Sequence, residues 1–127
     1  MKKQDLPLSP HLQIYKPQIT SLLSISHRIS GVALNFVLVI LVLGLLCITL
    51  GEGYFELLIS LINSFPIKII IFFAILGFSY HFLNGIRHII WDFGFLLGNR
   101  SSAIFGYIII ATSIISSIFI SKLLGLF

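Results

Sequence analysis

One stretch of the chain, residues 77–92 with the sequence GFSYHFLNGIRHIIWD, combines an apolar composition with residues that can do chemistry. In a helix, its glycines, histidines and aspartate recur at intervals of four, four, three and four residues, which places them on or near one face. They are Gly77, His81, Gly85, His88 and Asp92. Glycine one turn before and one turn after His81 leaves bare backbone, so a flat, bulky group can approach the imidazole closely. This face is a candidate cofactor site, and haem is the candidate cofactor.

His81 lies six residues before Arg87, which puts it about 9 Å deeper along the helix. Ionisable side chains at such depth in a membrane are costly and face a bundle interior, a water path or a cofactor. Neutral imidazole is a good iron ligand and the usual axial ligand of haem. A hydrogen bond from His81 to a neighbouring helix explains the same residue without any cofactor. One deep histidine cannot supply both axial ligands, so a second ligand would have to come from another chain.

Four basic side chains are expected at one level near the membrane surface: Arg87 and His88 from one helix, and His27 and Arg28 from another. The edge of a haem ligated at mid-depth would bring its propionates among these cations, where charge-assisted hydrogen bonds offset their desolvation. Alternatively, Arg28 and Arg87 only extend to the lipid headgroups and mark the topology.

Ser24 and Arg28 are one helical turn apart and therefore point the same way. A hydroxyl and a guanidinium at the membrane boundary can donate hydrogen bonds to a carbonyl oxygen of a quinone-like head group. A serine that only bonds the start of its own helix is the simpler interpretation of Ser24. Asp92 is a candidate for a proton path at the membrane surface, or an ion-pair partner of Arg100 or Lys16.

Three apolar segments of about twenty residues position these groups, and that length is sufficient to cross the hydrocarbon core. The segments are residues 29–50, 67–90 and 103–123. With 57% hydrophobic and 9% charged residues, the chain is predicted to be an all-α membrane protein with three transmembrane helices. Residues 1–28 are more polar and interrupted by prolines, which predicts an extended arm. The first helix is expected to begin near Ser21, with Thr20 or Ser21 as its cap.

The distribution of basic residues predicts the orientation of the spans. With the N-terminus in the cytoplasm and the C-terminus on the opposite side, six of the eight Lys and Arg residues lie on or near the cytoplasmic side: Lys2, Lys3, Lys16, Arg28, Arg87 and Arg100. They form no patch with interleaved aromatic residues, which argues against nucleic-acid binding. The N-terminal residues lack the features of a cleaved signal or a transit peptide. The expected location is a bacterial inner (cytoplasmic) membrane, or the mitochondrial inner membrane if the chain is organelle-encoded.

Two motifs resemble the signature segments of the cytochrome b556 subunit family of succinate dehydrogenase. The first is SISHRISG at residues 24–31, and the second is HFLNGIRHIIWDFG at residues 81–94, which matches the family pattern at every defined position. The arm LPLSPHLQIYKPQITS is also similar, so the resemblance covers nearly the whole chain. One departure is Leu6-Pro7 where the family usually has Arg-Pro, which puts in doubt only the contact of the arm with soluble subunits.

The resemblance implies a membrane anchor of a succinate:ubiquinone oxidoreductase, complex II, which oxidises no succinate by itself. It implies that His81 is an axial ligand of haem b and that a second, smaller anchor subunit supplies the other ligand. His27, Arg28 and His88 match positions near the propionates, Ser24 and Arg28 match residues lining the ubiquinone site, and Asp92 matches an acid close to it. The other implied partners are an iron–sulfur subunit and a flavoprotein subunit.

Two other functions compete with this interpretation. An anchor of a quinol:fumarate reductase would run the reverse reaction. A cofactor-free membrane scaffold or small transporter subunit would use His81 and Arg87 only to hold its helices together.

Overall fold

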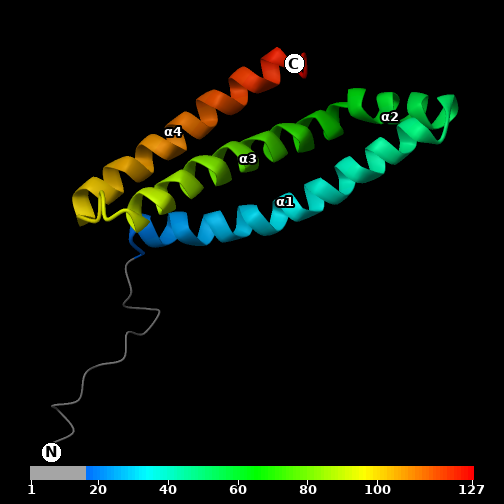
Figure 1. Ribbon diagram of the computed structural model, residues 1–127. Coiled ribbons are helices and arrows are strands. Elements are labelled where there is room, and N and C mark those ends of the chain that lie inside the picture. Colours follow the sequence, from blue (N-terminus) through cyan, green and yellow to red (C-terminus); the bar gives the residue numbers. More distant parts are fainter. Residues whose placement is uncertain (1–16) are drawn as a thin grey trace, which may run out of the picture.

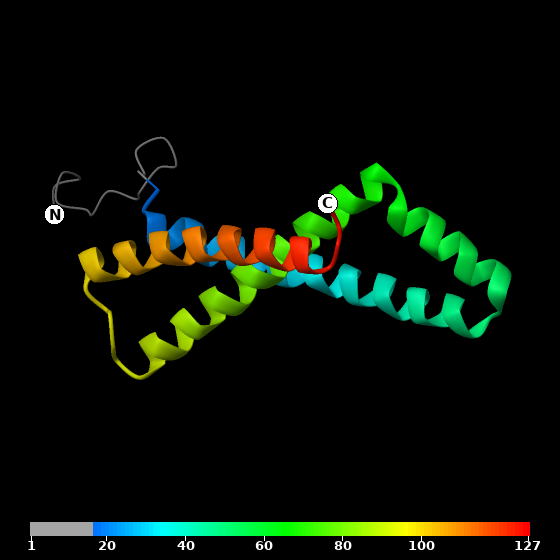
Figure 2. The same cartoon turned by 90° about the horizontal axis from the view of Figure 1, so that it is seen from above.

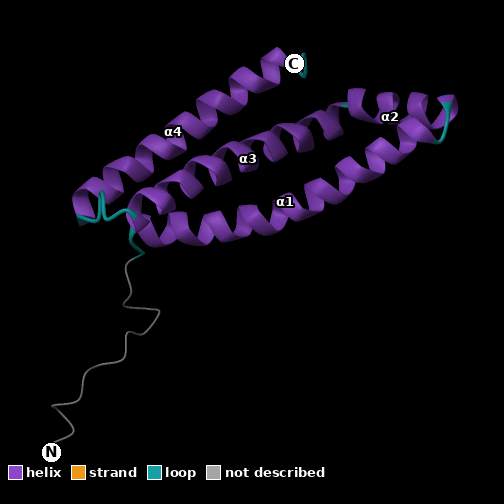
Figure 3. Cartoon of the chain, viewed as in Figure 1, coloured by secondary structure: helices purple, strands orange, loops and turns teal. Residues whose placement is uncertain are grey.

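The computed structural model describes residues 17–127, and this part of the chain folds into helices without strands (Figures 1 and 3). The elements are α1 (Ile19–Thr49), α2 (Glu52–Asn63), α3 (Phe65–Asp92) and α4 (Asn99–Leu123). The helices α1, α3 and α4 are long and apolar enough to cross a membrane, which confirms the predicted fold class. Lys2, Lys3, Lys16 and most of the predicted arm lie outside the described residues.

The first helix begins at Ile19, close to the start predicted near Ser21, and it includes ten residues that precede the predicted apolar span at residues 29–50. It contains 31 residues and is therefore about 46 Å long, well beyond the ~30 Å of a hydrocarbon core. The N-cap residue is Gln18, and its side chain makes no capping hydrogen bond, so the prediction of Thr20 or Ser21 as the cap residue is wrong. The whole motif at residues 24–31 is consequently helical, and its side chains follow the helical repeat.

The connection between the first two long helices is itself helical. Gly51 has a φ of 117°, a backbone conformation that suits glycine, and it lets α2 fold back beside the C-terminal half of α1 (Figure 1). Ser64 alone separates α2 from α3, and Pro66 lies in the first turn of α3, where no backbone N–H is required. Seen from above, the chain bends at this junction (Figure 2).

Small residues line the contact between α3 and α4. The buried residues of α4 are mostly serine and glycine: Ser102, Gly106, Ile109, Ser113, Ser117 and Ser121. The Ser113 hydroxyl donates to the backbone carbonyl of Ile109 at 2.7 Å, so it is satisfied within its own helix. Large apolar side chains point outward instead, as expected where lipid surrounds the bundle and small residues let helices approach.

Each long helix runs antiparallel to the next long helix along the chain, which brings the two polar motifs to one end of the bundle. The start of α1, the end of α3 and the start of α4 lie at this same end (Figure 1). This end carries both motifs and all the histidine and arginine residues of the described part of the chain.

Candidate functional site

Three histidine rings from two helices form a column at the polar end of the bundle. The ring of His27 on α1 stacks on the ring of His81 on α3, with centroids 4.0 Å apart and planes inclined by 5°. His88, two turns further along α3, lies 5.1 Å from His27. Trp91 follows, with its ring edge-on to His88 at 5.1 Å. The structure therefore brings together the three histidines that the sequence placed at this end.

One nitrogen of the His81 ring is held by α1. Its Nδ1 atom lies 3.1 Å from the backbone carbonyl oxygen of His27 and 3.1 Å from Oγ of Ser30. Within residues 17–127, no hydrogen bond is made to the other ring nitrogen, Nε2. The Nδ1 atom of His27 is buried and also lacks a hydrogen-bond partner within this range. Two histidine nitrogens at one site are thus left without a partner.

The glycines around His81 differ in how much space they leave. A Cβ added at Gly77 would meet nothing within 4 Å, whereas one at Gly85 would lie 3.8 Å from Cε1 of His27. The closest approach is at Gly31 on α1, where an added Cβ would be only 2.9 Å from Cε1 of His81. Bare backbone therefore faces the His81 region from both helices, and the sequence-based reasoning missed Gly31 and Ser30.

Arg87 is directed away from the histidine column. Arg87 follows His81 by six residues, which places it about 240° around the helix from His81. His88 follows by seven residues and therefore lies on almost the same face as His81. The Arg87 side chain is 0% exposed, and one guanidinium nitrogen donates to both the carbonyl oxygen and Oγ of Ser102, each at 3.0 Å. Another nitrogen donates to Oδ1 of Asn84 at 3.3 Å, and the guanidinium lies 4.1 Å above the ring of Trp91. The hydrogen-bond acceptors of Arg87 thus come from α3 and α4.

Two further side chains join the ends of α1 and α3. The Tyr80 hydroxyl donates to the carbonyl oxygen of Leu23 at 2.7 Å, and the Asn84 amide donates to the same oxygen at 3.4 Å. Both donors belong to α3, and Leu23 is one turn before His27. These bonds fix the register in which the histidines meet.

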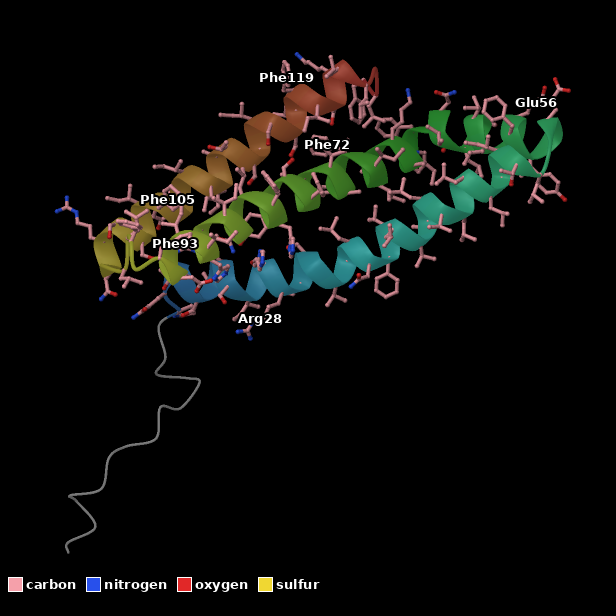
Figure 4. The ribbon with its side chains drawn as sticks, viewed as in Figure 1. Arg28, Glu56, Phe72, Phe93, Phe105 and Phe119 are labelled. Atoms are coloured by element: carbon pink, nitrogen blue, oxygen red, sulfur yellow. The ribbon has the colours of Figure 1, made fainter. Side chains whose placement is uncertain are left out.

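Ser24 and Arg28 border an open pocket of about 380 Å³ on the outer side of the histidine column. Its lining consists of Thr20, Ser21, Ser24, Ile25, Arg28 and Trp91. Arg28 is exposed and projects from α1 away from α3 and α4 (Figure 4). Nε1 of Trp91 is buried and has no hydrogen-bond partner in the described part of the chain. The structure thus adds Trp91 to the two side chains that the sequence singled out.

Arg28 also borders a second hollow, of about 450 Å³, which continues along α1 into the apolar region. The rest of its lining is Ile29, Val32, Ala33 and Phe36. A cation at the junction of a polar pocket and an apolar groove suits a molecule with a polar head and a long apolar tail.

Asp92 and Arg100 are both exposed, at the end of α3 and in the first turn of α4. The third member of the predicted acid–base group, Lys16, lies outside the described residues. Asp92 is thus on the same end of the bundle as the pocket, at its surface.

Three helices that are long and apolar enough to cross a membrane, with histidine, arginine and serine gathered at one end, define the class of this chain as a helical membrane protein with a polar site at one end of its bundle. The model of a protein family described as succinate dehydrogenase/fumarate reductase transmembrane subunit matches residues 2–120. The chain belongs to this family.

Individual relatives agree with the family match. The succinate dehydrogenase cytochrome b556 subunit of Rickettsia typhi is 44% identical over 109 residues, which cover 86% of this chain and 85% of that protein. The cytochrome b560 subunits of Chondrus crispus and Marchantia polymorpha are 48% and 45% identical over 101 residues each. These alignments cover 76% and 75% of this chain, and 78% and 73% of the two relatives.

Proposed function

We propose that this chain is the membrane-anchor subunit of a succinate dehydrogenase, where it holds haem b jointly with a second small anchor subunit and helps to form the ubiquinone-reducing site. The observation that carries the proposal is the state of the His81 ring. One of its nitrogens is bonded to α1, the other has no hydrogen bond within residues 17–127, and the ring lies against bare backbone. This is the arrangement of an imidazole prepared to bind a metal.

His81 is the axial ligand in this proposal, and a histidine of the partner anchor subunit is the other. The stacking of His27 on His81 supports this division, because parallel rings 4.0 Å apart present their faces to each other, not their nitrogens. In this arrangement His27 would not bind the same iron as His81. A bound haem supplies one-electron transfer.

The propionate region is assigned to His27, Arg28 and His88, whose N–H groups can donate to carboxylates at the end of the bundle. The unpartnered Nδ1 of His27 is one such donor. Arg87, which the sequence also placed in this region, would support it from the α4 side by holding Trp91. The open space at Gly77 and the light contact at Gly85 leave room for a flat group beside His81.

The quinone site is assigned to the pocket beside Ser24 and Arg28. The Ser24 hydroxyl and the Arg28 guanidinium can donate to the carbonyl oxygens of the ubiquinone ring while its apolar tail follows the groove along α1. Because an arginine keeps its charge, it would stabilise negative charge that develops on the oxygen during reduction. Asp92, exposed at the same end, is the proposed proton path.

The remaining partners follow from this assignment. An iron–sulfur subunit would deliver electrons at the polar end of the bundle, and a flavoprotein subunit would oxidise succinate. The polar end and the N-terminus would then face the cytoplasm of a bacterium, with the C-terminus across the inner membrane. The same subunit could serve a quinol:fumarate reductase, because the matching family includes both enzymes.

The test uses the chain assembled with its partner subunits. The wild-type complex should give a reduced-minus-oxidised difference spectrum of a b-type haem, and His81→Ala should weaken or abolish it. A wild-type complex without haem would reject the ligand assignment and favour the cofactor-free scaffold or transporter subunit. His11→Ala, in the arm, is the matched control and should keep the spectrum.

A further inference from the structure

Two residues of α1, Ser30 and Gly31, lie against the ring of His81 on α3. Oγ of Ser30 is 3.1 Å from Nδ1 of His81, and a Cβ at Gly31 would be 2.9 Å from Cε1 of the same ring. They follow His27 by three and four residues, so all three reach α3 from the same side of α1. Together they form a seat for the imidazole.

The hydrogen bonds around Ser30 determine which His81 nitrogen carries a proton. The Ser30 hydroxyl donates its single hydrogen to the carbonyl oxygen of His27 at 2.8 Å. Its oxygen can then only accept from Nδ1 of His81, and the carbonyl oxygen of His27, 3.1 Å from Nδ1, can only accept as well. A lone pair on Nδ1 would face two oxygens and be repelled. Nδ1 therefore carries a hydrogen that both oxygens share, and in the neutral ring the lone pair is on Nε2.

Gly31 sets the position of the ring rather than its protonation. Any side chain at this position would overlap Cε1, the carbon between the two ring nitrogens. The ring would have to turn or withdraw, and both movements would redirect Nε2. The contact comes from the neighbouring helix, so α1 fixes the orientation of a side chain on α3.

We propose that Ser30 and Gly31 are positioning residues that hold His81 in the Nδ1–H tautomer with Nε2 directed outward as the iron-binding atom. This inference rests on the proposed function of His81 as a haem ligand. Partners that bond the second nitrogen of a metal-binding histidine typically contribute about 10- to 100-fold in metal affinity. Ser30 and the carbonyl group of His27 occupy that position here.

The first experiment measures how fast haem leaves the assembled complex in detergent, by its transfer to apomyoglobin. Ser30→Ala should lose haem about tenfold faster than wild type. The control is Thr49→Ala, because Thr49 also donates to a carbonyl three residues earlier on α1 but contacts no histidine ring in the described structure. Equal rates in the two alanine variants would overturn the role of Ser30.

The second experiment separates the effect of the Ser30 hydroxyl group from the effect of side-chain shape. Ser30→Thr keeps the hydroxyl and should retain haem nearly as wild type does. Valine has the same shape as threonine but no hydroxyl, so Ser30→Val should lose haem as fast as Ser30→Ala. If Ser30 served only to pack the helices, the threonine and valine variants would lose haem at the same rate. Equal rates of haem loss in these two variants would therefore also overturn the proposal.

Gly31→Ala should reduce the haem content of the purified complex about tenfold or more, although alanine is the better helix former. Gly44→Ala is its control on the same helix, because an added Cβ there makes only an ordinary contact of 4.0 Å with Leu58. Full haem content in Gly31→Ala would refute the inference that Gly31 positions the ring of His81. If His81→Ala itself retains haem, the proposed function fails instead, so the two failures are distinguishable.

Discussion

Arg87 is the residue whose substitution tests the packing of α3 against α4 most directly. Its guanidinium makes three hydrogen bonds to Ser102 and Asn84 and lies over the ring of Trp91. The whole Arg87 residue is buried. Arg87→Lys keeps the buried positive charge, so the desolvation cost remains, but a single ammonium replaces the planar fork of donors. The substitution therefore isolates the value of these contacts.

The expected change in the free energy of unfolding follows from the contacts that a lysine cannot make. A lysine that keeps one of the three acceptors loses two hydrogen bonds, each about 0.6 to 1.5 kcal/mol. It also loses the guanidinium–indole contact, about 0.5 to 1 kcal/mol. We expect Arg87→Lys to lower the free energy of unfolding by about 2 to 4 kcal/mol.

The assay is equilibrium unfolding of the full chain in detergent micelles by titration with dodecyl sulfate. Far-ultraviolet circular dichroism reports the helices, and the fluorescence of Trp91, the single tryptophan, reports the environment beside Arg87. Arg100→Lys is the matched control, since Arg100 is exposed, and it should change the free energy by less than about 0.5 kcal/mol. If Arg87→Lys is as stable as this control in the haem-free chain, the inference that Arg87 joins α3 to α4 is wrong.

Three other substitutions test the pocket and the contact between helices. Arg28→Ala and Ser24→Ala should each lower quinone reduction by the complex while succinate oxidation with an artificial dye continues; equal loss of both activities would indicate a structural role only. Gly106→Ala should destabilise the chain by about 1 to 2 kcal/mol in the same unfolding assay, because its Cβ would overlap the buried side chain of Leu23. Gly53→Ala, whose Cβ meets nothing within 4 Å, should be neutral or slightly stabilising.

The sequence alone determined the features that depend on neighbouring residues along the chain. Three apolar segments predicted three spans, because the length needed to cross hydrocarbon is a local property. The helical repeat placed His81 and His88 on one face and aligned Ser24 with Arg28. The start of α1 was expected within two residues of Ile19, but its cap was assigned to Thr20 or Ser21 instead of Gln18, because the side chain of Gln18 makes no capping hydrogen bond that a sequence pattern could indicate.

Only the tertiary structure decided which residues meet across helices. Depth in the membrane grouped Arg87 with the histidines, but α4 approaches the opposite side of α3 and provides Ser102 as the acceptor. Ser30 and Gly31 were visible in the first motif, yet their contact with His81 spans 51 and 50 positions of sequence and depends on the register between α1 and α3. Helical periodicity specifies the faces of each helix separately. Packing between helices specifies which faces meet, and that pairing holds the ring of His81.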